Sequence, residues 1–197
     1  MPVIKSQLVK YRVFRNGECA TIALGEWTNP KLEGRPVSYG GEILIHSSFG
    51  NFSHCWSACS VPFKEFLVGI SMDSFMLKSM GPEYHKYNGK ESVRKLKAAI
   101  LRMRRQKLYS ADAVRDLWNS VCAEEDDAEH SESGFYRLVS NLRDGQFDDA
   151  EAYLSYHPHQ QAIGFWETLW PDFIAELKRE LLPAARELVA EPVEEDI

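Results

Sequence analysis

The sequence predicts an α+β fold, with an antiparallel sheet of about four strands at the N-terminus and a mostly helical C-terminal half. Before about residue 60, apolar and polar residues alternate loosely between turn-forming dipeptides, as in strands. From Pro62 onward, apolar residues recur at helical spacing. Hydrophobic residues form 44% of the 197 residues, which is ordinary for a globular protein and sufficient for a buried core.

We expect one domain overall, organised in three ranges. Residues 1–87 form the sheet with its covering helices, residues 88–190 form a helical region packed on it, and residues 191–197 form an acidic tail. The sequence contains no internal repeat and no low-complexity segment. These ranges therefore follow from the change of hydrophobic periodicity along the chain.

Two hairpins are expected in the sheet. Asn16-Gly17 is a strong signal for a tight turn between strands over residues 7–14 and 18–27. Further along, a third strand over residues 42–48 turns into a fourth over 52–58. One face of the fourth strand is apolar or aromatic, with Phe52, His54, Trp56 and Ala58. This pattern favours an antiparallel meander that is covered by helices on one side.

Several local signals place the helices. Pro62 suits a first helical turn, and Pro171 is expected to begin or kink a late helix. Either Ser71 or Asp73 is expected to cap a second short helix, and Ser110 suits the N-cap of a later one. A basic helix is predicted from Glu91 to about Leu108. Its narrow apolar seam contains Val93, Leu96, Ile100 and Met103.

Charge is distributed unevenly along the chain. Residues 1–107 hold 17 Lys and Arg against 8 Asp and Glu, whereas residues 108–197 hold 6 against 21. This asymmetry indicates either charged partners or attraction between the two halves within the fold. The most acidic run, EEDDAEHSES at 124–133, is expected to be a mobile connector between helices.

The sequence predicts a cytoplasmic protein with no membrane partner. No run of about 18 apolar residues is present, and the N-terminus lacks the apolar segment of a signal peptide. In that compartment the cysteines are expected to be reduced thiols, namely Cys19, Cys55, Cys59 and Cys122.

Catalytic and metal chemistry have weak support in the sequence. His54 and Cys55 point to opposite faces of a strand and no second cysteine pair exists, so no metal site is predicted. Cys55 or Cys59 with His46 could form a nucleophile pair, although packed histidines and small buried thiols explain the same residues. Because no Walker A motif and no helix-opening GxGxxG occur, no cofactor is predicted.

Two kinds of binding surface are candidates. The basic helix offers cations for nucleic-acid phosphates: Lys90, Arg94, Lys97, Arg102, Arg104 and Arg105. A solvated helix face, or a dock for the acidic half of the chain, is the alternative interpretation. A protein partner would instead be bound by acidic residues and an aromatic ridge: Glu124, Glu125, Asp126, Asp127, Trp166 and Trp170. Core packing is the alternative interpretation for the two tryptophans.

Two segments resemble a group of bacteriophage and prophage proteins. They are SSFGNFSHCWSACSVPFKEFLVGISMDSFMLKSMG at 47–81 and GFWETLWPDFIAEL at 164–177, of which PFKEFL and GFWETLWP are the most specific parts. The resemblance extends from about Gly40 to Leu177. It implies a small phage accessory protein in the bacterial cytoplasm and supplies no catalytic residues.

The resemblance and the candidate surfaces together lead to three functional hypotheses. The first is a non-enzymatic binding protein that inhibits or modulates a host protein or nucleoprotein complex, such as an anti-CRISPR or other anti-defence inhibitor. The alternatives are a nucleic-acid-binding accessory protein that uses the basic helix 90–107 and a Cys/His enzyme. A homo-oligomer is possible in each case, because the seam from Val93 to Met103 could pair between chains.

Overall fold

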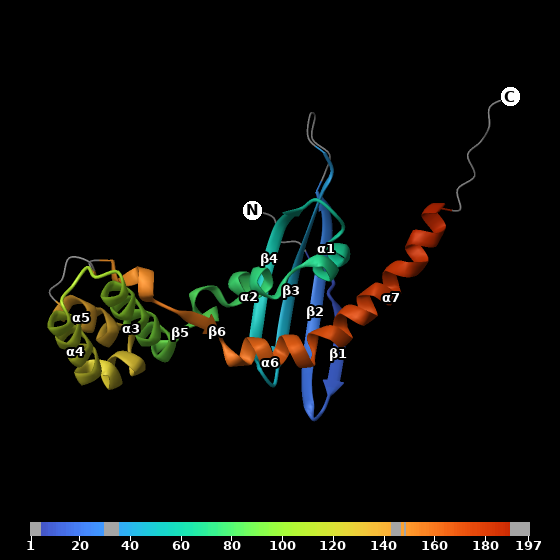
Figure 1. The fold of residues 1–197 in the computed structure, drawn as a ribbon. Coiled ribbons are helices and arrows are strands. Elements are labelled where there is room, and N and C mark those ends of the chain that lie inside the picture. Colours follow the sequence, from blue (N-terminus) through green and yellow to red (C-terminus); the bar gives the residue numbers. More distant parts are fainter. Residues whose placement is uncertain (1–4, 30–35, 143–146, 148, 190–197) are drawn as a thin grey trace. The chain divides into compact units, whose positions relative to one another are not determined.

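The computed structural model describes residues 5–29, 36–142, 147 and 149–189, with side chains as far as Leu182. The chain forms two compact units (Figure 1). The sheet unit contains the residues up to Tyr84 and those from His159 onward, and the helical unit is His85–Pro158. The expected ranges 1–87 and 88–190 divide the chain differently, because the last helices belong with the sheet. The acidic tail predicted at 191–197 lies outside the described residues.

The predicted α+β fold is confirmed. The described part of the sheet unit has one antiparallel sheet of order β1-β2-β3-β4, so the N-terminal hairpin joins the same sheet as the second hairpin. Its strands are β1 (Val9–Arg15), β2 (Glu18–Asn29), β3 (Ser38–Ser47) and β4 (Gly50–Cys59). Asn16 and Gly17 have φ values of 53° and 84°, as the two-residue turn between right-twisted strands requires.

One face of the sheet is covered by helices, which Figure 1 shows crossing the same side. They are α1 (Phe63–Gly69), α2 (Met72–Met80), α6 (Gln160–Thr168) and α7 (Trp170–Val189), and a short 3₁₀ turn, η1 (Gly81–Tyr84), follows α2. Alternate strand residues such as Ile22, Ile43 and Phe52 are buried in the core beneath them. The opposite face carries exposed residues, including Leu44 and His46.

The inward face predicted for β4 is correct for Phe52, His54 and Trp56 but wrong for Ala58. Pairing between β3 and β4 is irregular between Tyr39 and Gly41, which shifts the alternation of β4 by one residue near its end. Cys59 is therefore buried in the core and Ala58 is exposed.

The helix ends follow the predicted local signals. Pro62 is the N-cap of α1, and the Ser71 side chain caps α2 by accepting a hydrogen bond from the Ser74 backbone N–H. Pro171 is the second residue of α7, where the missing backbone N–H leaves no helical hydrogen bond unmade.

The helical unit begins and ends with a two-stranded ribbon of β5 (His85–Tyr87) and β6 (Tyr156–Pro158). Between these strands lie α3 (Gly89–Arg105), α4 (Ala111–His130), α5 (Glu132–Asn141) and the 3₁₀ turn η3 (Ala150–Tyr153). The predicted seam of α3 is confirmed, since Val93, Leu96, Ile100 and Met103 are all buried. They share a core with residues of the other helices, such as Val121 and Phe135.

The expected mobile connector at 124–133 is wrong. Helix α4 continues to His130, and only Ser131 separates it from α5. Ser131 caps both helices: its N–H donates to the Asp127 carbonyl, and its hydroxyl accepts from the Gly134 N–H. No Pro or Gly interrupts the acidic run, and Ala128 adds a buried position one heptad after Val121.

The described helices contain no segment that combines the length and the apolar character required to cross a lipid bilayer.

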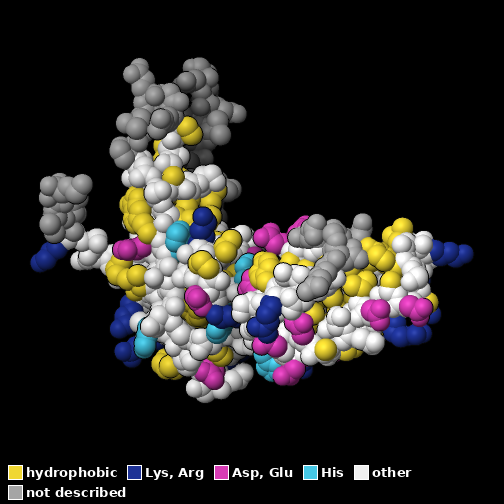
Figure 2. All heavy atoms as spheres, turned by 90° about the vertical axis from the view of Figure 1, so that its left-hand side faces the viewer, with side chains coloured by type: hydrophobic (Ala, Val, Ile, Leu, Met, Phe, Trp, Pro, Cys, Tyr) yellow, Lys and Arg dark blue, Asp and Glu magenta, His cyan; other side chains and the backbone are white. Residues whose placement is uncertain are grey.

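Figure 2 shows basic, acidic and hydrophobic side chains interspersed over the face that it presents.

Candidate functional site

Three of the cations on α3 stabilise the helical unit itself. Arg94 forms a bidentate pair with Glu91 one turn earlier, with its Nε 2.6 Å from the carboxylate. Lys95 donates to the backbone carbonyl of Leu154 at 3.1 Å. Lys97 reaches across to Glu125 on α4, at 2.6 Å between Nζ and Oε2. These cations are therefore engaged, and part of the attraction that the charge asymmetry indicates lies within this unit.

The remaining cations of the basic segment are exposed and form no ion pair within the described residues: Lys90, Arg102, Arg104, Arg105 and Lys107. Three of them lie in the last turn of α3, where positive charge is favoured by the carbonyl end of the helix dipole. We call Arg102, Arg104, Arg105 and Lys107 the basic end of α3. Their charges are available to a partner.

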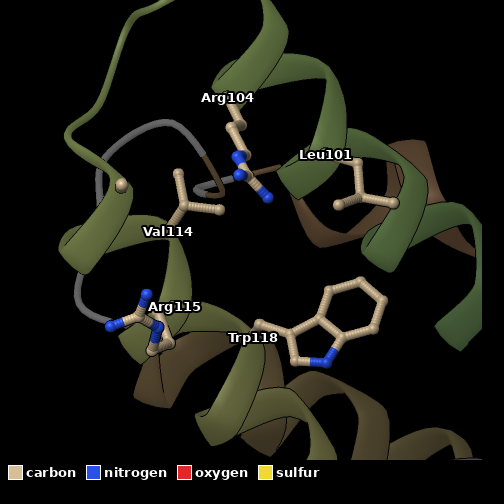
Figure 3. Close-up of a pocket in the computed structure, with 6 residues that line it drawn as sticks. Leu101, Arg104, Val114, Arg115 and Trp118 are labelled. Carbon is tan, nitrogen blue, oxygen red and sulfur yellow. The ribbon is translucent and has the colours of Figure 1, made fainter.

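A pocket of 260 Å³ lies where the basic end of α3 meets the start of α4 (Figure 3). Its walls combine cationic, apolar and aromatic side chains: Leu101, Arg104, Ala111, Val114, Arg115 and Trp118. Figure 3 shows Arg104 extending from α3 into the space above α4, with the Trp118 indole lying below Leu101. We call this space the Trp118 pocket.

The Trp118 ring is held from a second direction. Lys97 places its ammonium 5.4 Å from the centroid of the indole, which is within cation–π range. Because Lys97 is also fixed by Glu125, the half-buried ring has a defined position in the pocket wall. Arg115 is more loosely held, since its pair with Asp112 at 3.3 Å joins two exposed side chains.

The sequence-based candidates omit Arg115 and Trp118. Their proximity to Arg104 arises from the packing of α4 on α3, which no single helix encodes. A weaker local signal was present: Arg115 and Trp118 are three residues apart and so share one helix face.

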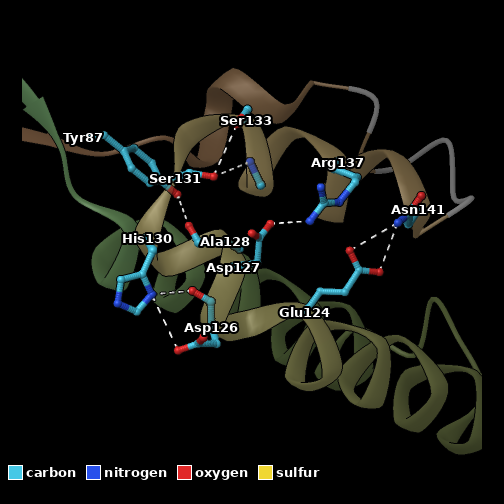
Figure 4. Close-up of polar contacts among 11 residues, drawn as sticks. Tyr87, Glu124, Asp126, Asp127, Ala128, His130, Ser131, Ser133, Arg137 and Asn141 are labelled. Atoms are coloured by element: carbon cyan, nitrogen blue, oxygen red, sulfur yellow. Dashed lines mark hydrogen bonds and ion pairs between the residues drawn. The ribbon is translucent and has the colours of Figure 1, made fainter.

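The acidic residues predicted to bind a protein partner all have contacts inside the helical unit, and Figure 4 shows those of Glu124, Asp126 and Asp127. Glu125 pairs with Lys97, Asp127 pairs with Arg137 of α5, and Glu124 accepts from the Asn141 amide at 3.1 Å. Asp126 is exposed and lies 3.6 Å from His130. A hydrogen bond to the Asp126 carbonyl, and then the Asp126 carboxylate, raise the pKa of His130 above its usual value. The run therefore joins α4 to α3 and α5.

The predicted tryptophan ridge exists, but it is not an exposed surface. Trp166 and Trp170 stack with ring centroids 4.7 Å apart. Trp170 is only 4% exposed and packs on Phe75, also at 4.7 Å, while Trp166 is half-buried against the same phenylalanine. Core packing, the alternative interpretation of the sequence, describes Trp170.

Comparison with protein families gives the origin of the chain. A family model described as a phage family matches residues 1–180. The chain belongs to this phage family. The match spans both units, including the basic end of α3 and the Trp118 pocket, and agrees with the resemblance of the two segments to phage proteins. No match was found among curated proteins or solved structures.

In this phage protein, the register of β3 and β4 holds His46 well apart from both Cys55 and Cys59. His46 lies beside Asn51, with Nδ1 2.7 Å from Oδ1. Cys55 lies opposite Glu42 in the register of β3 and β4. Since Glu42 is four residues along β3 from His46, Cys55 is about 13 Å from His46 along the strands. Burial raises the pKa of Cys59, which keeps its thiol protonated. His54 faces the other way, against Trp56, where burial and then Lys78 lower its pKa.

Among the described residues, no group of three or more His, Cys, Asp or Glu side chains is arranged to hold a metal ion. The basic end of α3 and the Trp118 pocket bring exposed cations and an aromatic ring together at one place on the helical unit.

Proposed function

We propose that this phage protein is a non-enzymatic nucleic-acid-binding accessory protein whose helical unit contacts phosphates. The observation that carries the proposal is the basic end of α3, with Arg102, Arg104, Arg105 and Lys107 exposed and without ion pairs in the described part of the chain. Four adjacent cations attract a polyanion and release the counterions condensed on it.

The net charge of the chain sharpens this preference. Because the chain carries a net charge of −6, a local basic cluster favours one orientation of approach by a polyanion. The other predicted nucleic-acid contacts contribute unequally: Lys90 is exposed, whereas Arg94 and Lys97 are already paired with carboxylates.

The direct test is a salt series of fluorescence anisotropy with a labelled oligonucleotide of about 15 nucleotides. The variant Arg102→Glu/Arg105→Glu is compared with Lys10→Glu/Arg12→Glu, which changes the same charge on exposed residues of β1. We expect the α3 variant to lose at least about tenfold in affinity and to reduce the salt slope by about two, while the β1 variant stays near wild type. Equal losses in both variants, or no binding at low salt, would contradict the proposal.

A second candidate function is inhibition or modulation of a host protein or nucleoprotein complex, including anti-defence inhibition. The observation that favours it is the edge strand β1, where Phe14 is 70% exposed and Val9 is 50% exposed. Exposed apolar residues on an edge strand are typical of protein contacts. Nuclease-treated pull-downs from host lysate should recover one stoichiometric protein with wild type and lose it with Phe14→Ser. Recovery that is unchanged by Phe14→Ser would exclude β1 as the contact.

A further inference from the structure

The Trp118 pocket has the size of a site for one ring system. Its 260 Å³ lies just below the range of about 300–1,000 Å³ that holds drug-sized ligands. Leu101 and Val114 add only a short apolar wall, which is too small for the face of a partner helix. A small planar group therefore fits better than a peptide segment.

The lining matches the chemistry of a nucleotide. The Trp118 indole lines the pocket with Lys97 near its ring, and Arg104 and Arg115 place positive charge at the same pocket. Any base can stack on an aromatic ring, because every base has a π-face. Cationic side chains nearby can bind the phosphates on either side of that base.

The surroundings favour an anion at the mouth of the pocket. Ala111, the first residue of α4, lines it, so the positive end of a 20-residue helix dipole lies there. The carboxylate beside Arg115 belongs to Asp112, and that pair is exposed and weak. A phosphate can therefore replace Asp112 as the partner of Arg115 at little cost.

We infer that the Trp118 pocket takes one unpaired base, stacked on the indole, while the basic end of α3 holds the flanking phosphates. This inference rests on the proposed function and adds the substrate class: single-stranded nucleic acid. In a duplex, the bases are stacked on one another and must be extruded at an energetic cost before one enters such a pocket.

The experiment compares three probes of the same length at one salt concentration: a single strand, its duplex, and a single strand whose central nucleotides are abasic. The proteins are full-length wild type, Trp118→Leu and Trp118→Phe, with Trp27→Leu as a matched control that removes a partly exposed tryptophan from β2. Circular dichroism checks that each variant is folded.

We expect wild type to bind the single strand about tenfold more tightly than the duplex or the abasic strand. Trp118→Leu should lose this preference while keeping its affinity for duplex. Trp118→Phe, which retains an aromatic face, should keep most of the preference, and Trp27→Leu should behave as wild type.

The outcomes separate this inference from the proposed function. If Trp118→Leu and Trp118→Phe both keep the wild-type strand preference, or wild type shows none, the base pocket is wrong while phosphate binding stands. If wild type binds none of the probes at low salt, both proposals fall.

Discussion

Glu180 on α7 is the residue at which three elements of the sheet unit meet. It accepts hydrogen bonds from Tyr11 of β1 at 3.1 Å and from Lys64 of α1 at 2.9 Å. Burial alone would raise the pKa of Glu180, but the hydrogen bonds from Lys64 and then Tyr11 outweigh it and hold the pKa below its usual range. Burial by itself lowers the pKa of Lys64, yet the bond to Glu180 leaves it raised. Both shifts indicate a favourable pair.

Replacing this carboxylate should weaken the sheet unit in a pH-dependent way. We expect Glu180→Gln to lower the free energy of unfolding by about 1 kcal/mol at pH 7, a value reduced because the side chain is one-third exposed. Since the folded pKa lies below the unfolded one, the stabilisation is present above the usual carboxylate pKa of about 4.3 and is lost as pH falls through the folded pKa.

The measurement is urea unfolding followed by tryptophan fluorescence, which reports mainly the sheet unit because it holds four of the five tryptophans. The difference from wild type should shrink between pH 7 and about pH 3.5. Glu65→Gln, an exposed carboxylate of α1, is the control. A Glu180→Gln protein as stable as wild type at pH 7 would show that the three-way contact contributes nothing.

At the scale of elements, close approach of α3 and α4 depends on Gly89. Asn88 caps α3 by accepting from the Glu91 N–H, and Gly89 follows as the first helical residue. A Cβ at this position would overlap the backbone carbonyl of Glu129 on α4. Because a backbone atom cannot move aside as a flexible side chain can, the absence of a side chain sets the distance between the two helices.

We therefore expect Gly89→Ala to destabilise the helical unit by about 1–3 kcal/mol, although alanine has the higher helix propensity. Gly69→Ala in α1, where a Cβ would meet no atom within 4 Å, should be neutral or stabilise by up to about 1 kcal/mol. Thermal unfolding followed by far-UV circular dichroism compares the two. Equal melting temperatures for both variants would mean that α3 and α4 can separate without loss.

At the scale of the whole molecule, the helical unit is an insertion in the sheet unit. The chain leaves the sheet unit after Tyr84 and re-enters it at His159, whose N–H donates to the Tyr84 carbonyl at 2.7 Å. Each unit has its own buried hydrophobic cluster. The two connection points are adjacent, so the sheet unit does not need the insertion to bring its ends together.

Each unit should consequently fold without the other. A chain in which a short Gly-Ser linker replaces residues 85–158 should keep the tryptophan emission of the sheet unit, and the excised 85–158 segment should remain helical and unfold cooperatively. Near-UV and far-UV circular dichroism with thermal melts test both. A non-cooperative thermal melt of either piece would show that its own hydrophobic cluster does not stabilise that unit without the other.

Features encoded within a few residues were determined by the sequence itself. The Asn16-Gly17 hairpin, the Ser71 and Ser110 caps and the buried seam of α3 each depend on backbone preference or on 3.6-residue periodicity, which neighbouring residues supply. The α+β class followed from the order of these local signals.

Only the tertiary structure decided the rest. The acidic run is helical, and tertiary packing sets Lys97 of α3, which is distant in sequence, against Glu125 of this run. Trp170 became core because α7 returns to the sheet after the inserted unit. The Trp118 pocket exists because two helices bring Arg104 beside Trp118. Periodicity specifies which face of a helix is apolar, but which partner covers that face depends on contacts between residues distant in the chain.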